Sequence, residues 1–367
     1  MATCPLGIQL ILHLGQKTPR PAPATVMTAL QRVRIVNDTA GEEGFELTFS
    51  LRKGQTGALE LLHSGLLDPD TRAVIGVRIG VQVQPLCDGV IYYQQVTPAE
   101  GDALTLTVMG RGIAVMLDLA QRTATYPNQK ASDIVRQLLT HYADYGIIGL
   151  EDITPTNEQP SEQRLIPGQH DTDQGYIRQL AERKGFIFYI EPATLGTTKV
   201  YWGPPERKTP PLPPLLFHLG PATNVTDLRF THDPLAPVQV TGETLEPGQK
   251  RSQTIKAPKQ SPLLAVAQPT PARRTVLLPN AARLGPAAAR EAAAAMTAKA
   301  PDALTAEGSL DTVRYGAVLR AHRVISVRGA GRTFDGDYLI RQVTHELAPG
   351  NYTQRFRLSR KGLGVKK

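Results

Sequence analysis

The sequence predicts a mainly β protein of the α+β class, in which two antiparallel β domains flank a small α/β unit. Aromatic residues make up only 5% of the chain, which has 32 glycines and 30 prolines, a composition typical of short elements joined by turns. Alternating apolar and polar residues recur in the first and last parts of the chain, and two helix-like patterns stand between them. A length of 367 residues favours two or three domains over one.

Residues 1–26 are expected to form an N-terminal arm. Its apolar run from Leu6 to Leu14 is about half of the ~20 residues that a membrane span needs. No basic residues precede the run and no small-residue cleavage site follows it, so we expect a docking strand and neither a signal peptide nor a membrane span. Cys4 and Cys87 are too few for a disulfide framework or a cysteine zinc site, which indicates folding in a reducing cytosol.

The first β domain is expected over residues 27–126. Strict alternation of apolar and polar side chains predicts half-buried strands in GFELTFSL (44–51), VRIGVQV (77–83) and DALTLTVMG (102–110). Three such strands in close succession predict one antiparallel sheet.

The α/β unit is expected over residues 127–203. In SDIVRQLLTHYADYG, Ser132 is placed to cap a helix and Gly146 to end it. The apolar stripe of this helix consists of Ile134, Val135, Leu138, Leu139 and Tyr142.

A second helix is expected in DTDQGYIRQLAERKGFIFYIEP (171–192). Asp171 or Thr172 can accept hydrogen bonds from the first turn, and Gly185 suits the left-handed position after the last turn. A strand apolar on both faces should follow at 186–190 and be covered on each side. The buried helix face is expected to consist of Ile177, Leu180 and Ala181.

The second β domain is expected in two pieces, 204–245 and 309–367. The residues between them, 246–308, are rich in proline and alanine and are predicted to be an insertion with one helix in GPAAAREAAAAMTAKAP. Near the C-terminus, Pro349 and Gly350 suit a hairpin turn. The strand after that turn should bury Tyr352, Phe356 and Leu358 and expose Thr353, Arg355 and Arg357.

No motif predicts catalysis, a metal site or a cofactor. HELAP starts like the zinc motif H-E-x-x-H but has Pro349 in place of the second histidine, so His345 is interpreted as a strand histidine. RGAGRTFDG has Phe334 at the third glycine position of a dinucleotide loop and is interpreted as a tight turn before a strand. Glu42 and Glu43 are expected to be solvated charges in a turn.

The basic charge of the chain lies near its C-terminus. The formal net charge is +8, and residues 314–367 carry twelve Lys and Arg against three acids. A nucleic-acid site is one interpretation. A solvated or channel-facing surface explains the charge equally well, because no aromatic stacking platform or recognition helix accompanies it.

Three segments in this order resemble the central hub proteins of contractile injection machines. They are SDIVRQLLTHY, the helix and strand at 171–192, and FDGDYLIRQVTHELAPGNYTQRFRLSR. The resemblance is to the late-control-protein-D family of contractile phages and to the hub half of the valine-glycine-repeat spike proteins of type VI secretion. A closing hairpin motif of this family is filled here by Gly336, Tyr338, Val343 and His345.

The resemblance implies a structural hub without enzymatic activity or cofactor. It implies two tube-like β-barrel domains with the α/β unit as a brace, and a homotrimer that joins the sixfold inner tube to the threefold spike around a channel. Its partners would be the inner tube protein, a separate spike protein and other baseplate components, assembled in a bacterial cytoplasm into a phage tail-like particle. Arg341, Arg355 and Arg357 are the candidate interface or channel residues. Two alternatives stay open, a nucleic-acid-binding module and a baseplate cell-wall hydrolase.

Overall fold

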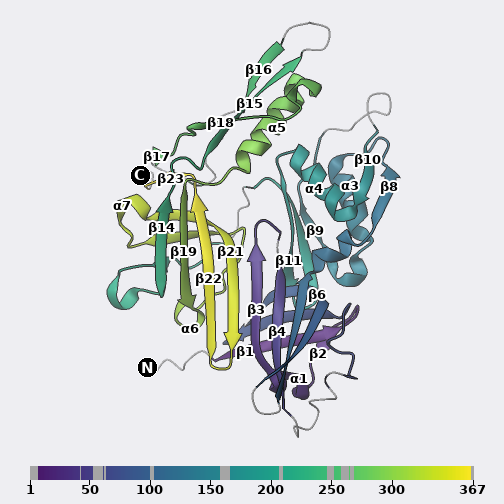
Figure 1. Ribbon diagram of the computed structural model, residues 1–367, viewed down its shortest axis with the longest axis vertical. Helices are drawn as coiled ribbons and strands as arrows, with labels where there is room; N and C mark the ends of the chain where they lie inside the picture. Colours follow the sequence, from purple (N-terminus) through teal and green to yellow (C-terminus); the bar gives the residue numbers. More distant parts are fainter. Residues whose placement is uncertain are drawn as a thin grey trace.

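The computed structural model describes residues 7–41, 43–52, 61, 63–99, 103–157, 166–205, 210–245, 252–257, 264 and 268–364 of the chain. Two β domains lie side by side, an α/β unit packs beside the first, and a smaller lobe extends beyond the second (Figure 1). Antiparallel pairing dominates the sheets, which confirms the predicted fold class.

The first β domain is built from antiparallel strands around one apolar core. Its elements are β1 (Ile8–Gly15), β2 (Arg20–Pro21), α1 (Ala24–Ala29), β3 (Leu30–Asp38), β4 (Gly44–Arg52), β5 (Arg72–Ile79), β6 (Gln82–Pro98) and β7 (Ala103–Gly112). Alternate side chains such as Leu47, Phe49 and Leu106 are buried, which confirms the strands predicted at 44–51 and 102–110. The apolar run of the predicted arm is β1, which pairs with β5 along its whole length.

The strand predicted at 77–83 is wrong, because this segment is a hairpin. β5 ends at Ile79, the chain turns at Gly80 with φ +58°, and β6 begins at Gln82. Val81 is 96% exposed at the tip, although its place in the alternation predicted burial.

The α/β unit has its own core and begins earlier than predicted. Its elements are η1 (Ile113–Asp118), β8 (Gln121–Thr125), α3 (Ala131–Thr140), η2 (Ala143–Tyr145), β9 (Ile147–Ile153), β10 (Gly168–Thr172), α4 (Asp173–Arg183), β11 (Ile187–Thr194) and β12 (Thr197–Gly203). Residues 113–126 were predicted in the first β domain, but β8 pairs with β10, and Ile113 and Leu117 pack in the core of the α/β unit.

Helix α4 forms as its sequence predicts. The Thr172 hydroxyl accepts a hydrogen bond from the Gly175 amide at 3.1 Å, and Gly185 has φ +66° after the last turn. The predicted face of Ile177, Leu180 and Ala181 is buried. Each is at most 5% exposed, which confirms that face.

The predicted apolar stripe is buried, but α3 lacks its predicted cap and ends at Thr140, before Tyr142 of the stripe and before the predicted terminator Gly146. Lys130 occupies the N-cap position, and Ser132 lies inside the first turn, 1% exposed. The Ser132 hydroxyl instead meets the Thr156 amide and hydroxyl, both at 3.3 Å, so a tertiary contact takes the place of the cap.

The second β domain surrounds a separate apolar core. Its elements are β13 (Leu215–Leu216), η3 (Gly220–Ala222), β14 (Asp227–His232), β19 (Leu304–Asp311), α6 (Thr312–Tyr315), β20 (Val324–Arg328), α7 (Gly331–Phe334), β21 (Gly336–Ala348), β22 (Asn351–Arg360) and β23 (Gly362–Leu363). Tyr352, Phe356 and Leu358 are buried in β22, and Arg355 and Arg357 are exposed, as predicted.

The lobe contains β15 (Val238–Leu245), β16 (Ser252–Lys256), β17 (Gln268–Pro269), β18 (Arg274–Leu277), η4 (Ala281–Arg283) and α5 (Pro286–Ala298). Helix α5 confirms the predicted alanine-rich helix. The strand pairing moves both boundaries between the lobe and the second β domain away from the predicted boundaries at 246 and 308. β15 pairs with β16 and β18, and its Val240 packs against Ala293 of α5. β19, which starts within the predicted insertion, lies between β14 and β22.

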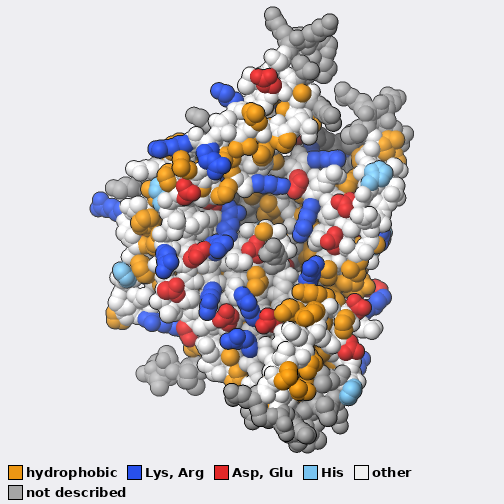
Figure 2. Space-filling view, viewed as in Figure 1, with side chains coloured by type: hydrophobic (Ala, Val, Ile, Leu, Met, Phe, Trp, Pro, Cys, Tyr) orange, Lys and Arg blue, Asp and Glu red, His pale blue; other side chains and the backbone are white. Residues whose placement is uncertain are grey.

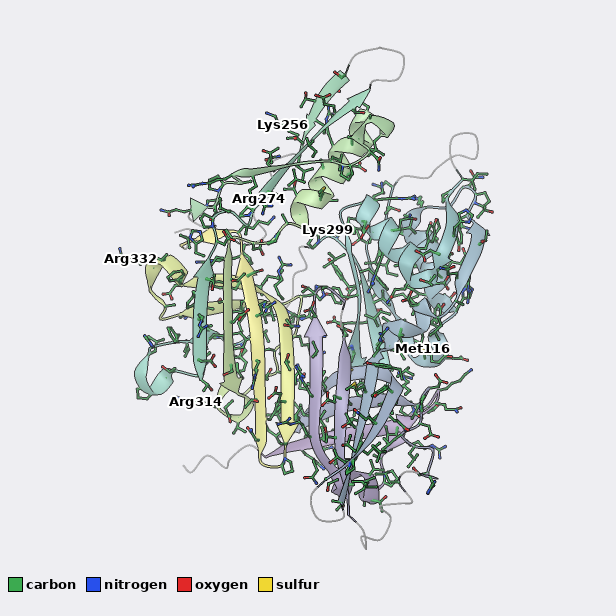
Figure 3. The ribbon with its side chains drawn as sticks, viewed as in Figure 1. Met116, Lys256, Arg274, Lys299, Arg314 and Arg332 are labelled. Atoms are coloured by element: carbon green, nitrogen blue, oxygen red, sulfur yellow. The ribbon has the colours of Figure 1, made fainter. Side chains whose placement is uncertain are left out.

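The lobe and the α/β unit meet at α5 and α4. Lys299, labelled in Figure 3, follows the last turn of α5 and forms an ion pair with Glu182 of α4 at 2.6 Å. Among the described residues, no helix is long and apolar enough to cross a membrane.

The two β domains repeat one strand order. Hydrogen bonding runs β3-β4-β7-β6-β5-β1 in the first and β14-β19-β22-β21-β20-β13 in the second, and corresponding strands also follow in the same order along the chain. The register shifts at the same place in both, between Ile91 and Tyr93 of β6 and between Ile340 and Gln342 of β21. The last pair differs, since β1 is antiparallel to β5 and β13 is parallel to β20.

One junction joins the two repeats into a continuous sheet. β21 of the second domain pairs antiparallel with β3 of the first, from Gln342 opposite Asp38 to Leu347 opposite Val33. The sheet therefore runs from β14 across both domains to β6 without a break (Figure 1).

Candidate functional site

The candidate site is the outward face of this continuous sheet, which we call the polar face. Since side chains alternate along strands, residues in register across strands share one face. Glu346 of β21 lies opposite Arg34 of β3, and Arg34 lies opposite Glu46 of β4, so the face crosses the domain boundary. Its residues are Arg32, Arg34, Glu46, Thr48, Asp227, Arg229, Glu307, Ser309, Gln342, Thr344, Glu346, Thr353, Arg355 and Arg357.

Positive and negative side chains are interspersed on the polar face. Figure 2 shows Lys and Arg next to Asp and Glu over the sheet, with no large area of one sign. The face as defined carries five arginines and four carboxylates. Such a surface lacks the single-sign stripe by which proteins hold a phosphate backbone.

The three candidate arginines lie on or beside this face, each next to a carboxylate. Arg357 contacts Glu307 at 2.8 Å, and Arg355 lies 3.6 Å from Glu346. These two arginine side chains are 56% and 69% exposed, so each pair contributes little to stability.

Arg341 occupies the bulge of β21 at one end of the face. Its guanidinium donates to the Ser359 hydroxyl and to the Asp302 carboxylate, both at 2.7 Å. Ser359 is the next outward residue of β22 after Arg357, so the structure brings all three predicted arginines to one strand pair.

A shallow groove crosses the polar face between β14 and β21. Asp227, Glu307, Gln342, Arg355 and Arg357 are among the residues that line it. Gly308 and Phe356 line the groove together with these polar and charged side chains. It offers hydrogen-bond donors and acceptors to a partner surface but no enclosed volume for a small molecule.

Part of the basic charge of 314–367 lies in the interior. Arg360 is 1% exposed and donates to the carbonyls of Asp335 and Thr333, both at 2.9 Å. Its guanidinium lies 4.5 Å from the centre of the Tyr338 ring. Arg360 therefore adds to the formal charge without contributing to a basic surface.

Another arginine of this segment connects all three main bodies of the chain. Arg320 of the second β domain donates to the carbonyl of Pro192 in the α/β unit at 3.4 Å and to that of Pro85 in the first β domain. Beside it, Arg323 forms an ion pair with Glu191 at 2.8 Å. We call this place, with Arg320, Arg323 and Glu191 at its centre, the three-way junction. Sequence reasoning missed it because its partners are more than 100 residues apart.

Glu43 corrects the prediction of a solvated carboxylate. It is half-buried and accepts a hydrogen bond from Asn37 at 2.8 Å. The pKa of Glu43 is raised to about 8, mainly by burial and then by the charge of Glu191, while the charge of Arg320 acts in the opposite direction. Glu42 lies outside the described residues.

The remaining sequence motifs lack the geometry of active sites. His345 is a buried residue of β21 within 2.9 Å of the Tyr352 hydroxyl, as expected for a strand histidine. Burial and, to a smaller extent, the charge of Arg320 lower the pKa of His345 to about 3. The Gly-rich motif forms the four-residue helix α7 where a tight turn was predicted, and it leads into β21, which confirms that a strand follows. In the described part of the chain, no three His, Cys, Asp or Glu side chains stand close enough to hold a metal ion.

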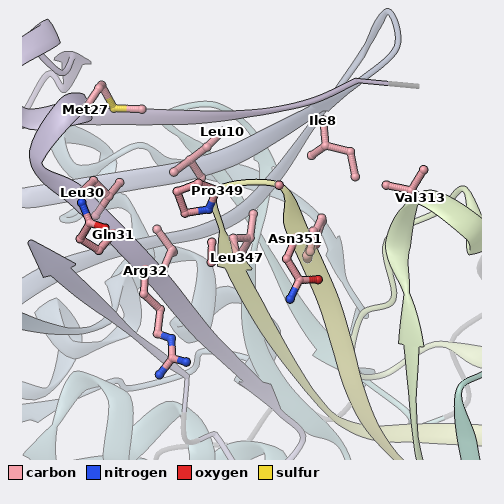
Figure 4. A pocket seen from close by; sticks show the side chains of 14 residues that line it. Ile8, Leu10, Met27, Leu30, Gln31, Arg32, Val313, Leu347, Pro349 and Asn351 are labelled. Carbon is pink, nitrogen blue, oxygen red and sulfur yellow. The ribbon is translucent and has the colours of Figure 1, made fainter. Parts of the chain in front are cut away.

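An apolar cavity of about 350 Å³ opens where β1, β3 and the β21–β22 turn meet (Figure 4). Ile8, Leu10, Met27 and Leu347 point into it, and Arg32 at its rim is the charged residue of its lining. A lining without an acid–base pair or an activated nucleophile cannot support hydrolysis.

Solved structures of tail proteins share this fold. A tail protein from Neisseria meningitidis matches with a TM-score of 0.64 at 16% identity over 96% of both chains. The 43 kDa tail protein of prophage MuSo2 from Shewanella oneidensis matches with a TM-score of 0.63 at 13% identity, over 96% of this chain and 98% of that one. An E. coli component of the type VI secretion system matches with a TM-score of 0.53 at 12% identity, over 92% and 76%.

No curated protein matches the sequence. The family model of the phage tail baseplate hub (GPD) matches residues 48–351, from β4 to the start of β22. This match spans both β domains and the α/β unit between them. The chain therefore belongs to the phage tail baseplate hub family and is a baseplate hub of phage tail-like structures.

Proposed function

We propose that this hub assembles as a homotrimer around a central channel and joins the sixfold inner tube to the threefold spike. The observation that carries the proposal is the repeated strand order of the two β domains within one chain. Three chains present six similar domains, which match a sixfold tube, while the chain itself repeats only three times and matches a threefold spike. Closed rings of this kind satisfy the symmetry rules of homo-oligomers.

The polar face is the surface that lines the channel in this proposal. Its interspersed charges keep it hydrated, and the mixed signs avoid a strong attraction for cargo of either sign. Arg341, Arg355 and Arg357 lie there or meet the neighbouring tube subunit. The α/β unit and the three-way junction hold the two β domains at a fixed angle on the outside.

The function is structural, without enzymatic activity or cofactor. Its partners are the inner tube protein, a separate spike protein and other baseplate components, and the particle is assembled in the bacterial cytoplasm. The alternative of a nucleic-acid-binding module is less well supported, because the arginines of the polar face stand beside carboxylates. The alternative of a cell-wall hydrolase is less well supported, because the lining of the apolar cavity contains no acid–base pair.

Two measurements test the proposal. A tagged copy of the chain should co-purify with tube, sheath and spike subunits, and electron microscopy of the particle should show three copies around a pore. A particle with a single copy, or with the polar face turned away from the pore, would refute it. Binding of DNA that weakens steeply with salt would favour the nucleic-acid alternative instead.

A further inference from the structure

The apolar cavity beside β1 exists because part of the inner face of this strand is only partly covered. Leu12 and Leu14 of that face are 3% and 4% exposed. Ile8 and Leu10 share the face, since side chains alternate along a strand, but they are only half-buried. In the described part of the chain, the first half of β1 therefore presents apolar side chains to a cavity of about 350 Å³ (Figure 4).

The cavity lies where the two β domains meet. One wall is formed by β1 and Met27 of α1, and the other by the turn between β21 and β22. Leu347 and Tyr352, on either side of that turn, come from the second β domain but pack in the core of the first. Domain interfaces are preferred places for small-molecule sites, which typically enclose ~300–1,000 Å³. The volume of this cavity suits a ligand at the small end of that range.

Strand pairing holds both walls in place. β1 pairs with β5 from Ile8 opposite Ile79 onward, and Val33 of β3 pairs with Leu347 of β21. The cavity is therefore preformed. A ligand can enter it without ordering a segment of the chain, which removes one of the main costs of binding.

The inside of the cavity is apolar, and its polar side chains stand at the mouth. The Tyr352 hydroxyl already has a partner, because it lies 2.9 Å from Nδ1 of His345. Gln31, Arg32 and Asn351 are exposed. Water is poorly held where polar partners are few, and apolar cavities take up apolar molecules instead. The ligand of this cavity should therefore have an apolar body.

The charge at the mouth indicates the head group of the ligand. Arg32 is the charged residue of the lining. Arg34, the next outward residue of β3, lies between Glu46 and Glu346 in the sheet, whereas Arg32 lies opposite Thr48. The strand register thus places carboxylates beside Arg34 but a hydroxyl beside Arg32. A guanidinium binds carboxylates through charge-assisted hydrogen bonds.

We propose that this cavity binds a medium-chain aliphatic carboxylate, which is the chemistry of a short fatty acid. The chain lies against Ile8, Leu10, Met27 and Leu347, and the carboxylate lies at the mouth beside Arg32. The apolar chain leaves water while the charged head stays hydrated on its outer side, so neither part is placed in an unfavourable environment. The site is complete within one chain and does not depend on the proposed assembly.

Methyl NMR of the full-length chain, with isotope-labelled methionine methyl groups, tests the site directly. The chain has five methionines, of which Met27 lines the cavity, Met116 lies in η1 and Met296 in α5. The Met27 signal, assigned from Met27→Leu, should shift with added decanoate and saturate. The signals of Met116, labelled in Figure 3, and Met296 should not shift. Octanoate should bind about 15-fold more weakly than decanoate, because it buries two fewer methylenes.

Substitutions separate the contributions of the chain and the head group. Arg32→Gln should weaken the binding of octanoate about two- to fivefold and leave that of octanol, which has the same chain length, unchanged. Arg78→Gln is the matched control and should change neither, because Arg78 is exposed opposite Gln9 on the outer face of β1 and β5. Leu10→Asn should weaken all three ligands at least tenfold.

Each outcome decides the proposal. A saturable Met27 shift that follows chain length, and that Arg32→Gln weakens for octanoate alone, supports it. No effect of Arg32→Gln, or an equal effect on octanoate and octanol, overturns the carboxylate head group. No Met27 shift with millimolar decanoate, or equal shifts of all methionine signals, overturns the site. If circular dichroism shows that Leu10→Asn does not fold, the chain-length series and Arg32→Gln still decide.

Discussion

Removal of the Arg72 side chain should destabilise the chain by about 3–5 kcal/mol, the range measured when one partner of a buried ion pair is deleted. Arg72 is 2% exposed, and its guanidinium donates to both carboxylate oxygens of Asp88, at 2.7 and 2.6 Å. It also donates to the carbonyls of Lys17 at 3.1 Å and Gly196 at 2.8 Å. Gly196 lies in the turn between β11 and β12, so one side chain ties the first β domain to the α/β unit.

The loss is large because Asp88 would stay buried without its cation. Burial already raises the pKa of Asp88 although Arg72 lowers it. In Arg72→Met the carboxylate must therefore take up a proton or remain charged in the interior, and both cost free energy. Arg72→Met with Asp88→Leu should recover at least 2 kcal/mol of that loss, since replacing a buried ion pair by apolar residues is often nearly neutral.

Urea unfolding at fixed chain concentration measures these differences. Trp202 is the single tryptophan of the chain and is fully buried in the α/β unit. Its fluorescence therefore reports on the unfolding of the unit that Arg72 ties to the first β domain. Lys17→Met is the matched control. The Lys17–Asp144 ion pair is as short, at 2.6 Å, but its side chains are 63% and 68% exposed, so its loss should cost less than about 1 kcal/mol. Equal losses from Arg72→Met and Lys17→Met would refute the reasoning.

Three further predictions rest on contacts elsewhere in the chain. The folded-state pKa of Glu43 is about 8, above its unfolded value near 4.5. The free energy of unfolding should therefore fall as pH rises between these two values and then level off. Glu43→Gln should remove this pH dependence, and urea midpoints of the variant that still fall with pH would contradict the assignment. Arg355→Glu with Arg357→Glu should leave the isolated chain folded, as measured by circular dichroism, but should reduce the yield of particles. Glu in place of the exposed Arg78 of β5 should not reduce that yield. Normal particles from the double variant would show that the face is merely solvated. Thr172→Ala should lower the free energy of unfolding by about 1 kcal/mol through loss of the α4 cap, and an unchanged urea midpoint would argue against that cap.

Local patterns predicted the elements whose burial is decided by their own sequence. In β4, Leu47 and Phe49 alternate with polar residues, and in α4, Ile177 and Leu180 share one face, so period alone identified their inner sides. The same reasoning failed at 77–83, where Val81 continues the alternation through a hairpin tip. Alternation of apolar and polar residues does not show where the chain makes a hairpin turn.

Long-range packing decided what the sequence could not show. Val240 of β15 is buried by α5, about 50 residues away, and this contact assigns β15 to the lobe instead of the second β domain. Glu43 lies in an unremarkable charged turn, and the charges that act on its pKa, those of Glu191 and Arg320, come from the α/β unit and the second β domain. The candidate arginines Arg355 and Arg357 were found from alternation, but their carboxylate partners required the sheet register.

The repeat within the chain has left little trace in the sequence because packing constrains pairs of residues more than single ones. Leu47 lies opposite Val108 in the first β domain, and the equivalent pair in the second is Gly308 opposite Phe356. A β-carbon at Gly308 would lie 2.9 Å from the Phe356 ring, so the large side chain occupies the space that the glycine leaves. The pair keeps its total number of side-chain carbon atoms while both residue types change, and cores tolerate such compensating substitutions best. Strand order, bulge and register cannot be exchanged in this way, because a shift by one residue would turn every side chain to the other face. The two β domains are therefore equivalent in the hydrogen bonding of their strands and not in the residue types at corresponding positions.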